Sequence, residues 1–126
     1  MLGHSFPTRR SSDLDAAIAV LARHVPTIVV KRGSSGVRVH SKGKITDVAP
    51  INVVPIDTIG AGDSFDAGFL CAYLMGRDAV TAARAGNITG ALSTQATGGT
   101  EAFRNSEQRE VFLRAHGFFD LLATAP

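Results

Sequence analysis

In the first part of the chain, the spacing of apolar and polar positions predicts one short helix followed by several extended segments. From Asp15 onward, apolar residues recur every three or four positions until Pro26 ends the helical stripe. The following segments are rich in β-branched residues and are separated by turn residues, as strands are. We predict extended segments at residues 27–32, 37–41, 44–50 and 51–57, the first two joined as a hairpin. Pro50 and Pro55 favour edge or irregular positions, because proline cannot donate to a β-ladder.

The second part of the chain has the three-to-four-residue spacing of amphipathic helices. We predict three helices, at residues 60–76, 78–97 and 105–122. Asp78 and Asn105 are the expected N-caps, because a short polar side chain can accept a hydrogen bond from a first-turn amide. Gly76 suits a left-handed C-cap. Strands followed by helices that need a sheet to cover their apolar faces indicate the α/β class.

Composition restricts the classes of function. With 126 residues, 44% of them apolar, the chain is long enough for one globular domain or part of one. The formal charge is only +2 and both signs are mixed, which argues against nucleic acid or an anionic membrane as a partner. Cys71 is the only cysteine, so an internal disulfide and a thiolate metal site are excluded. This use of cysteine indicates a reducing, cytoplasmic protein. No apolar run is long enough to span a bilayer, so we predict no membrane partner.

Residues 1–14 lack the periodic pattern of apolar residues that begins at Asp15. They are polar, basic and aperiodic, and the run from His4 to Leu14 resembles a translated sequencing adapter. We therefore expect residues 1–14 to be a non-native or disordered leader, and the folded domain to cover residues 15–126. The alternative is a flexible basic tail that can be modified or can bind acidic partners.

Small residues and a carboxylate meet at residues 57–69, DTIGAGDSFDAGF, where the last extended segment gives way to a helix. Gly60, Ala61 and Gly62 allow a tight turn, and the first amides of a helix lack an intrahelical acceptor, so they can bind a phosphate oxygen. The helix dipole favours a negative charge on Asp63, which can then accept a proton from a substrate hydroxyl. This arrangement suits phosphoryl transfer. For GAGD alone, an ordinary helix N-cap is the commoner explanation.

The longer run at residues 57–69 closely resembles the signature of the ribokinase, or PfkB-type, carbohydrate kinase family, and the resemblance extends from Asp15 to Leu122. It implies a ribokinase-like three-layer α/β fold, truncated here to the C-terminal, nucleotide-side portion. It also implies that Asp63 is the catalytic base and that neighbouring amides form the anion hole for the γ-phosphate of ATP. The implied catalytic residues are Gly60, Ala61, Gly62 and Asp63.

The same resemblance implies sites for a nucleotide and for cations. The backbone of residues 31–36 would pack against ATP, and Asn87 would lie near the adenine. The implied nucleotide-binding residues are Lys31, Arg32, Gly33, Ser34, Ser35, Gly36, Gly62, Asp63 and Asn87. Family members often hold a monovalent cation such as K⁺, and the matching positions are Asp57, Ile59, Ser93 and Gly98. Mg²⁺ would arrive with ATP, although the acidic motif with which the family helps to hold it is not in this sequence.

The resemblance leaves out the family's N-terminal half, which carries most of the central sheet, a small lid and the residues that bind the sugar. The acceptor site is therefore missing, and we expect the chain alone to be poorly soluble or inactive. The favoured function is an ATP-dependent sugar kinase, present as a fragment, with a sugar and ATP as partners and a homodimer as one option for the full-length protein. A nucleoside kinase and a noncatalytic nucleotide-binding module are the alternatives. A Rossmann site is disfavoured, because its glycines would follow the first strand of a βαβ unit.

Overall fold

The structure, a computed structural model, describes residues 11–123, and residues 1–10 and 124–126 lie outside the described part. Most of the predicted leader is therefore not described. Its last residues are helical, because helix α1 (Ser11–Leu21) begins before the start expected at Asp15. The non-native origin of the leader stays a prediction.

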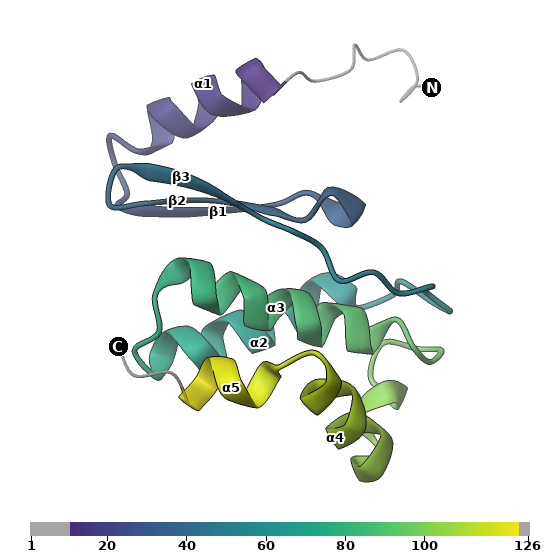
Figure 1. The fold of residues 1–126 in the computed structure, drawn as a ribbon. Coiled ribbons are helices and arrows are strands. Elements are labelled where there is room, and N and C mark those ends of the chain that lie inside the picture. Colours follow the sequence, from purple (N-terminus) through teal and green to yellow (C-terminus); the bar gives the residue numbers. More distant parts are fainter. Residues whose placement is uncertain (1–10, 124–126) are drawn as a thin grey trace, which may run out of the picture.

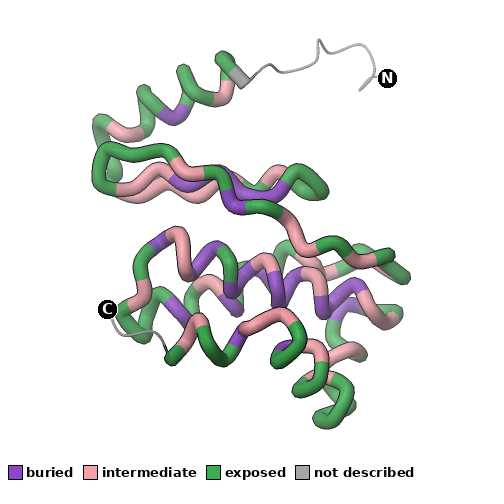
Figure 2. Tube along the Cα trace, in the orientation of Figure 1, coloured by how far each residue is buried: buried purple, intermediate pink, exposed green. Residues whose placement is uncertain are grey.

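The described residues are arranged in layers (Figure 1). Helix α1 lies on one side of a three-stranded antiparallel sheet, and helices α2 and α3 lie on the other side. The C-terminal helices α4 and α5 pack against α3 on its far side from the sheet. Figure 2 shows that α3 is the most deeply buried helix, since it is enclosed between the sheet, α2 and the C-terminal helices. This is the α/β layered arrangement expected from the sequence.

The sheet has the strand order β1-β2-β3, as the predicted hairpin and the next strand require. The strands are β1 (Thr27–Lys31), β2 (Val37–Ser41) and β3 (Lys44–Val48). The register pairs Val29 with Val39 and Val37 with Val48, so these valines share one face. That face packs against Phe65 of α2 and against alanines of α3. The alternation in the sequence therefore places the apolar side of the sheet against the helix pair.

The opposite face of the sheet is tied to α1 by a buried arginine. Arg38 donates to the carboxylate oxygens of Asp47 on β3 at 2.7 and 3.1 Å, and to Asp15 of α1 at 2.9 Å. The hydrogen bond from Arg38 lowers the pKa of the Asp47 carboxyl below its usual value. Ile18 of α1 is also buried. The ion pair between Arg38 and Asp15 links α1 to the sheet.

The segment at residues 51–57, predicted to be extended and, because of Pro50 and Pro55, at an edge or irregular position, forms no strand. No strand pairs with it among residues 11–123. Instead, the amides of Ile56 and Asp57 donate to the carbonyl of Thr94 at 2.7 and 3.2 Å, just past the end of α3. Pro50, just before the segment, and Pro55, within it, lack the backbone donors that a ladder needs. Val54 is left 86% exposed.

Helices α2 (Ala61–Leu74) and α3 (Ala79–Ser93) form the main helix pair. The predicted caps are confirmed: the Asp78 side chain accepts from the amide of Thr81 at 2.7 Å, and Gly76 has a φ of +88°. Helix α3 ends before residue 97, which was expected to be its limit.

The two helices approach closely because small residues lie at their crossing. A Cβ atom added at Gly68 of α2 would lie 2.9 Å from the carbonyl oxygen of Ala85 on α3, and one at Gly86 would lie 2.8 Å from the Phe65 ring. Thr89 of α3 donates its hydroxyl to the carbonyl of Ser64 at 2.6 Å. The glycine positions therefore set the distance between the helices.

The third predicted helix is two helices, so the single span 105–122 is wrong. Asn105 caps α4 (Ser106–Ala115) by accepting from the amide of Gln108 at 3.0 Å, as predicted. The chain then turns at Gly117, whose φ of +77° breaks the helix before α5 (Phe118–Ala123). Within the described residues, no helix is long and apolar enough to cross a bilayer.

Candidate active site

A cavity of about 380 Å³ lies where the β1–β2 turn, the segment after β3, the start of α2 and the middle of α3 meet. Of the residues singled out in the sequence, those that line it are Lys31, Arg32, Gly33, Ser34, Gly36, Ala61, Gly62 and Asn87. Ser35, in the same turn, does not line it. Residues from three of the segments predicted to form the nucleotide site therefore line one cavity, and its ligand stays a prediction.

The β1–β2 turn reaches the cavity through a tight 3-10 turn, η2 (Gly33–Ser35). The amide of Arg32 donates to the carbonyl of Gly36 at 2.8 Å and closes the turn. Gly36 packs directly on the segment after β3, since a Cβ atom there would lie 3.1 Å from the backbone nitrogen of Pro50. The missing side chain of Gly36 therefore lets the turn pack against the backbone after β3 beside the cavity.

The start of α2 supplies unpaired backbone amides. Gly60 is the N-cap residue, with a left-handed φ of +77°. The amide of Ala61 donates to the carbonyl of Thr58 at 3.2 Å, so it is already used and the expectation that it is free is wrong. The amides of Gly60, Gly62 and Asp63 have no hydrogen-bond acceptor among residues 11–123. Three of the four expected anion-hole donors thus remain.

Asp63 lies in the first turn of α2 and its side chain is exposed. Within the described part of the chain, its carboxylate makes no hydrogen bond and no ion pair. It does not line the cavity, and neither does Gly60, whereas Ala61 and Gly62 do. The carboxylate is thus accessible to an incoming group beside the cavity.

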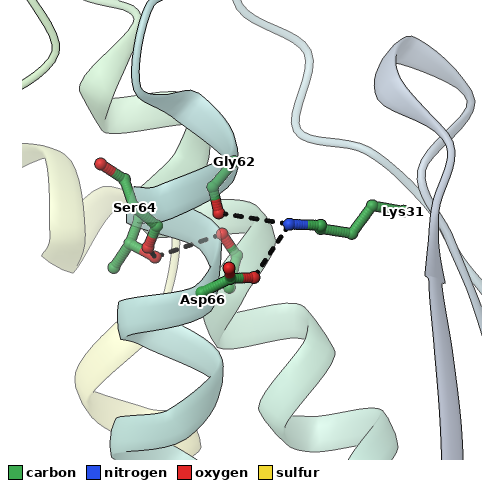
Figure 3. A network of polar contacts seen from close by, with 6 residues as sticks. Lys31, Gly62, Ser64 and Asp66 are labelled. Carbon is green, nitrogen blue, oxygen red and sulfur yellow. Dashed lines mark hydrogen bonds and ion pairs between the residues drawn. The ribbon is translucent and has the colours of Figure 1, made fainter.

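Lys31 connects the hairpin to the start of α2 (Figure 3). Its Nζ atom lies 2.9 Å from Oδ1 of Asp66 and 3.5 Å from the carbonyl oxygen of Gly62. It also lies 5.6 Å from the centre of the Phe65 ring, within the range of a cation–π contact. The sequence indicated only a backbone role for Lys31, and its side-chain contacts depend on tertiary structure.

The four residues expected near a monovalent cation converge on one loop contact. Asp57 accepts hydrogen bonds through Oδ1 from the amide of Ile59 at 2.9 Å and through Oδ2 from the amide of Gly98 at 3.0 Å. These two bonds, that of Ile59 first, lower the pKa of the Asp57 carboxyl. The fully buried Ser93 donates to the carbonyl of Gly99 at 3.0 Å, and Gly99 packs against Ile59. The carboxylate thus holds the loop before α2 to the loop after α3.

Asn87 lies on the wall of the cavity formed by α3. Its side-chain amide donates to the carbonyl of Ala49 at 2.8 Å. The side chain therefore fixes the segment after β3, and its carbonyl oxygen makes no hydrogen bond within the described residues. The side-chain carbonyl oxygen of Asn87 can therefore accept a hydrogen bond from a ligand.

The cavity has further lining residues that the sequence reasoning missed. Thr58 and Phe65 belong to the motif segment, and Phe65 lies four positions after Ala61, which is the helical spacing that could have identified it. Gly90 lies four positions after Gly86 on α3, and a Cβ atom there would lie 3.2 Å from the carbonyl oxygen of Ala61. Pro55 had no such signal.

The residues present suit a nucleotide better than an isolated metal ion. Among residues 11–123, no group of three or more His, Cys, Asp or Glu side chains could hold a metal. The cavity wall is mostly apolar and includes Val37, Val53 and Phe65, which suits a flat base. Unpaired amides at the start of α2 suit a phosphate. An Mg²⁺ ion would therefore be held mainly by the nucleotide.

Comparison with known proteins identifies the family. Residues 3–105 match the pfkB family of carbohydrate kinases, and the chain belongs to this family. An uncharacterized sugar kinase from Archaeoglobus fulgidus is 34% identical over 91 residues, which are 72% of this chain and 36% of that protein. A nucleoside kinase from Methanocaldococcus jannaschii is 34% identical over 96 residues, 75% of this chain and 32% of that protein.

Solved structures agree with this assignment. Two crystal structures of fructokinase from Vibrio cholerae O395, one of them a double mutant, match with TM-scores of 0.68 and 0.69. They are 30% and 29% identical and cover 79% of this chain and 35% and 34% of the fructokinase chain. Both hold fructose and ADP, one with a calcium ion and the other with a potassium ion. The chain thus has part of the ribokinase-like fold and spans about a third of the length of its relatives.

Proposed function

We propose that this chain is the nucleotide-side part of an ATP-dependent carbohydrate kinase that transfers the γ-phosphate of ATP to a sugar hydroxyl. The observation that carries the proposal is the start of α2. There, unpaired amides and the exposed Asp63 carboxylate lie next to a cavity lined by the β1–β2 turn. Family membership supports it, because the relatives are kinases of sugars and nucleosides.

In this proposal, ATP occupies the cavity, with the base against its apolar wall and near Asn87. The phosphates extend toward α2, where the amides of Gly60, Gly62 and Asp63 donate to the transferring group and stabilise its charge. Asp63 accepts the proton of the attacking hydroxyl, since it has no other described partner. Positioning and charge stabilisation supply most of the rate in this class of reaction.

Cations have secondary roles in the proposal. Mg²⁺ accompanies ATP and neutralises its phosphates. A monovalent cation such as K⁺ binds at the loops of Asp57, Ile59, Ser93 and Gly98, which the Asp57 carboxylate already holds together. A potassium ion in one related fructokinase supports this choice. A cytoplasmic location and a homodimer of the full-length protein are part of the same proposal.

The test is Asp63→Asn in a version of the protein extended to the length of its relatives. We expect kcat for a sugar acceptor to fall by about 100-fold or more, because a positioned base contributes that much, while ATP affinity stays within about twofold. Glu107→Gln is the matched control, since it makes the same acid-to-amide change in the first turn of α4. Turnover within about tenfold of wild type in Asp63→Asn would refute the base role.

A nucleoside kinase is the second candidate, and the relative from Methanocaldococcus jannaschii favours it. The same assay separates the two activities when sugars and nucleosides are offered in parallel as acceptors. ATP binding without turnover on either class would support a noncatalytic nucleotide-binding module instead. Such a result would contradict the proposed kinase activity.

A further inference from the structure

The Lys31 ammonium occupies the boundary between the cavity and the start of α2. The side chain extends from the last residue of β1, lines the cavity and meets the first two turns of α2 (Figure 3). The Nζ atom lies 3.5 Å from the carbonyl oxygen of Gly62, so the ammonium reaches the backbone of a residue whose amide is unpaired. A positive charge is therefore placed where the proposed phosphates enter.

The partner of Lys31 holds it only weakly. The side chains of Lys31 and Asp66 are 44% and 55% exposed, and ion pairs this exposed contribute about 0–1 kcal/mol. An ammonium group has three N–H donors, whereas only Asp66 accepts at a short distance and the carbonyl of Gly62 lies at the limit of 3.5 Å. A nucleotide phosphate carries more negative charge than one carboxylate, so it competes well for this ammonium.

We propose that the Lys31 side chain binds a phosphate of the nucleotide. In the absence of nucleotide, the Asp66 carboxylate forms an ion pair with the Lys31 ammonium, and it competes with the phosphate for that group. The inference rests on the proposed function, because it assumes that a nucleotide enters this cavity. It assigns to the side chain a role that backbone packing of the turn does not supply. It also gives the two members of the ion pair opposite effects on nucleotide affinity.

The experiment measures binding of ATP, ADP and adenosine to the 126-residue chain by isothermal titration calorimetry. Lys31→Met keeps the apolar stem and removes the charge, and we expect it to weaken ATP and ADP binding about 10- to 100-fold, the size of a hydrogen bond between charged groups. Adenosine, which has no phosphate, should change by less than about twofold. Asp66→Asn should strengthen ATP binding about three- to tenfold, because it removes the competing charge.

Control variants separate this role from a structural one. Lys44→Met removes the same charge at an exposed position at the start of β3, outside the cavity lining, and should leave ATP affinity within about twofold. Lys31→Arg keeps the charge and should retain ATP binding within about fivefold of wild type. Circular dichroism and thermal melting show whether each variant is folded before its affinity is compared.

The outcomes distinguish this inference from the proposed function. If the wild-type chain is folded and binds neither ATP nor ADP, the proposed function fails. If wild type binds ATP and Lys31→Met binds it equally well, only the role of Lys31 fails. Equal losses for ATP and adenosine in Lys31→Met would show that the lysine acts through packing and would overturn the inference. A weaker affinity for ATP in Asp66→Asn would overturn the competition by Asp66.

Discussion

Replacement of Gly68 by alanine tests whether close helix packing builds the site. Gly68 lies in the interior of α2, where it faces α3. A Cβ atom there would lie 2.9 Å from the carbonyl oxygen of Ala85 and even closer to the hydroxyl of Thr89. Ala85 contributes backbone, which cannot rotate away as a flexible side chain can. The helices must therefore separate or shift along each other.

The magnitude follows from opposing contributions. Alanine in place of glycine inside a helix gains up to about 1 kcal/mol from backbone propensity. Overpacking costs about 1–3 kcal/mol, and the bond from Thr89 to the carbonyl of Ser64, 2.6 Å long in the structure, is lost at a cost of about 1 kcal/mol. The net expectation for Gly68→Ala is a destabilisation of about 1–3 kcal/mol. The melting temperature should then fall by about 4–12 °C.

The assay is urea unfolding followed by circular dichroism, with Gly62→Ala as a matched control in the same helix. At Gly62 the added Cβ atom would meet only the Lys31 ammonium, at an ordinary 3.6 Å. Gly62→Ala should therefore be neutral or stabilising by up to about 1 kcal/mol. The double variant Gly68→Ala with Thr89→Ala should cost less than the sum of the two single changes, because one clash is removed.

Two results would refute the packing argument. Gly68→Ala could be as stable as wild type, which would mean that the helix pair is loosely packed. Alternatively, Gly62→Ala and Gly68→Ala could show equal effects, which would mean that only helix propensity matters. In both cases the close approach of α2 and α3 would not be what shapes the cavity.

Two further changes have expected outcomes. Asp78→Ala removes the N-cap of α3 and should lower the free energy of unfolding by about 1 kcal/mol at pH 7. The hydrogen bond from the amide of Thr81 lowers the pKa of Asp78 below 3.8, so its stabilisation is present above that pH and lost as the pH falls through the lower folded value. Wild type and variant should thus converge in acid melts, and a constant difference would contradict the charge role. Gly36→Ala should weaken ATP binding and destabilise the chain by about 1–3 kcal/mol, because its Cβ atom would clash with the carbonyl oxygen of Val48 and the residue has a left-handed φ of +86°. Unchanged calorimetric titrations and melts would rule this out.

Much of the candidate site could be predicted, because several of its residues are adjacent in the sequence. The glycines and the acid at residues 60–63 form one turn and one helix start, and local geometry alone decides which amides lack acceptors. The bond from Ala61 to Thr58 was the exception, since it depends on how the preceding loop folds back. The ion pair of Lys31 and Asp66 could not be predicted, because the two residues are 35 positions apart.

The sequence by itself determined the local elements of this protein. Alternation placed the three strands, helical spacing placed α2 and α3, and short polar side chains at Asp78 and Asn105 began their helices, since these effects act over a few residues. Only the tertiary structure decided that residues 51–57 would bond to the end of α3 and that Asp57 would join two loops. The physical reason is that backbone amides donate to the acceptors that the packed chain brings near, and no local sequence pattern identifies those acceptors.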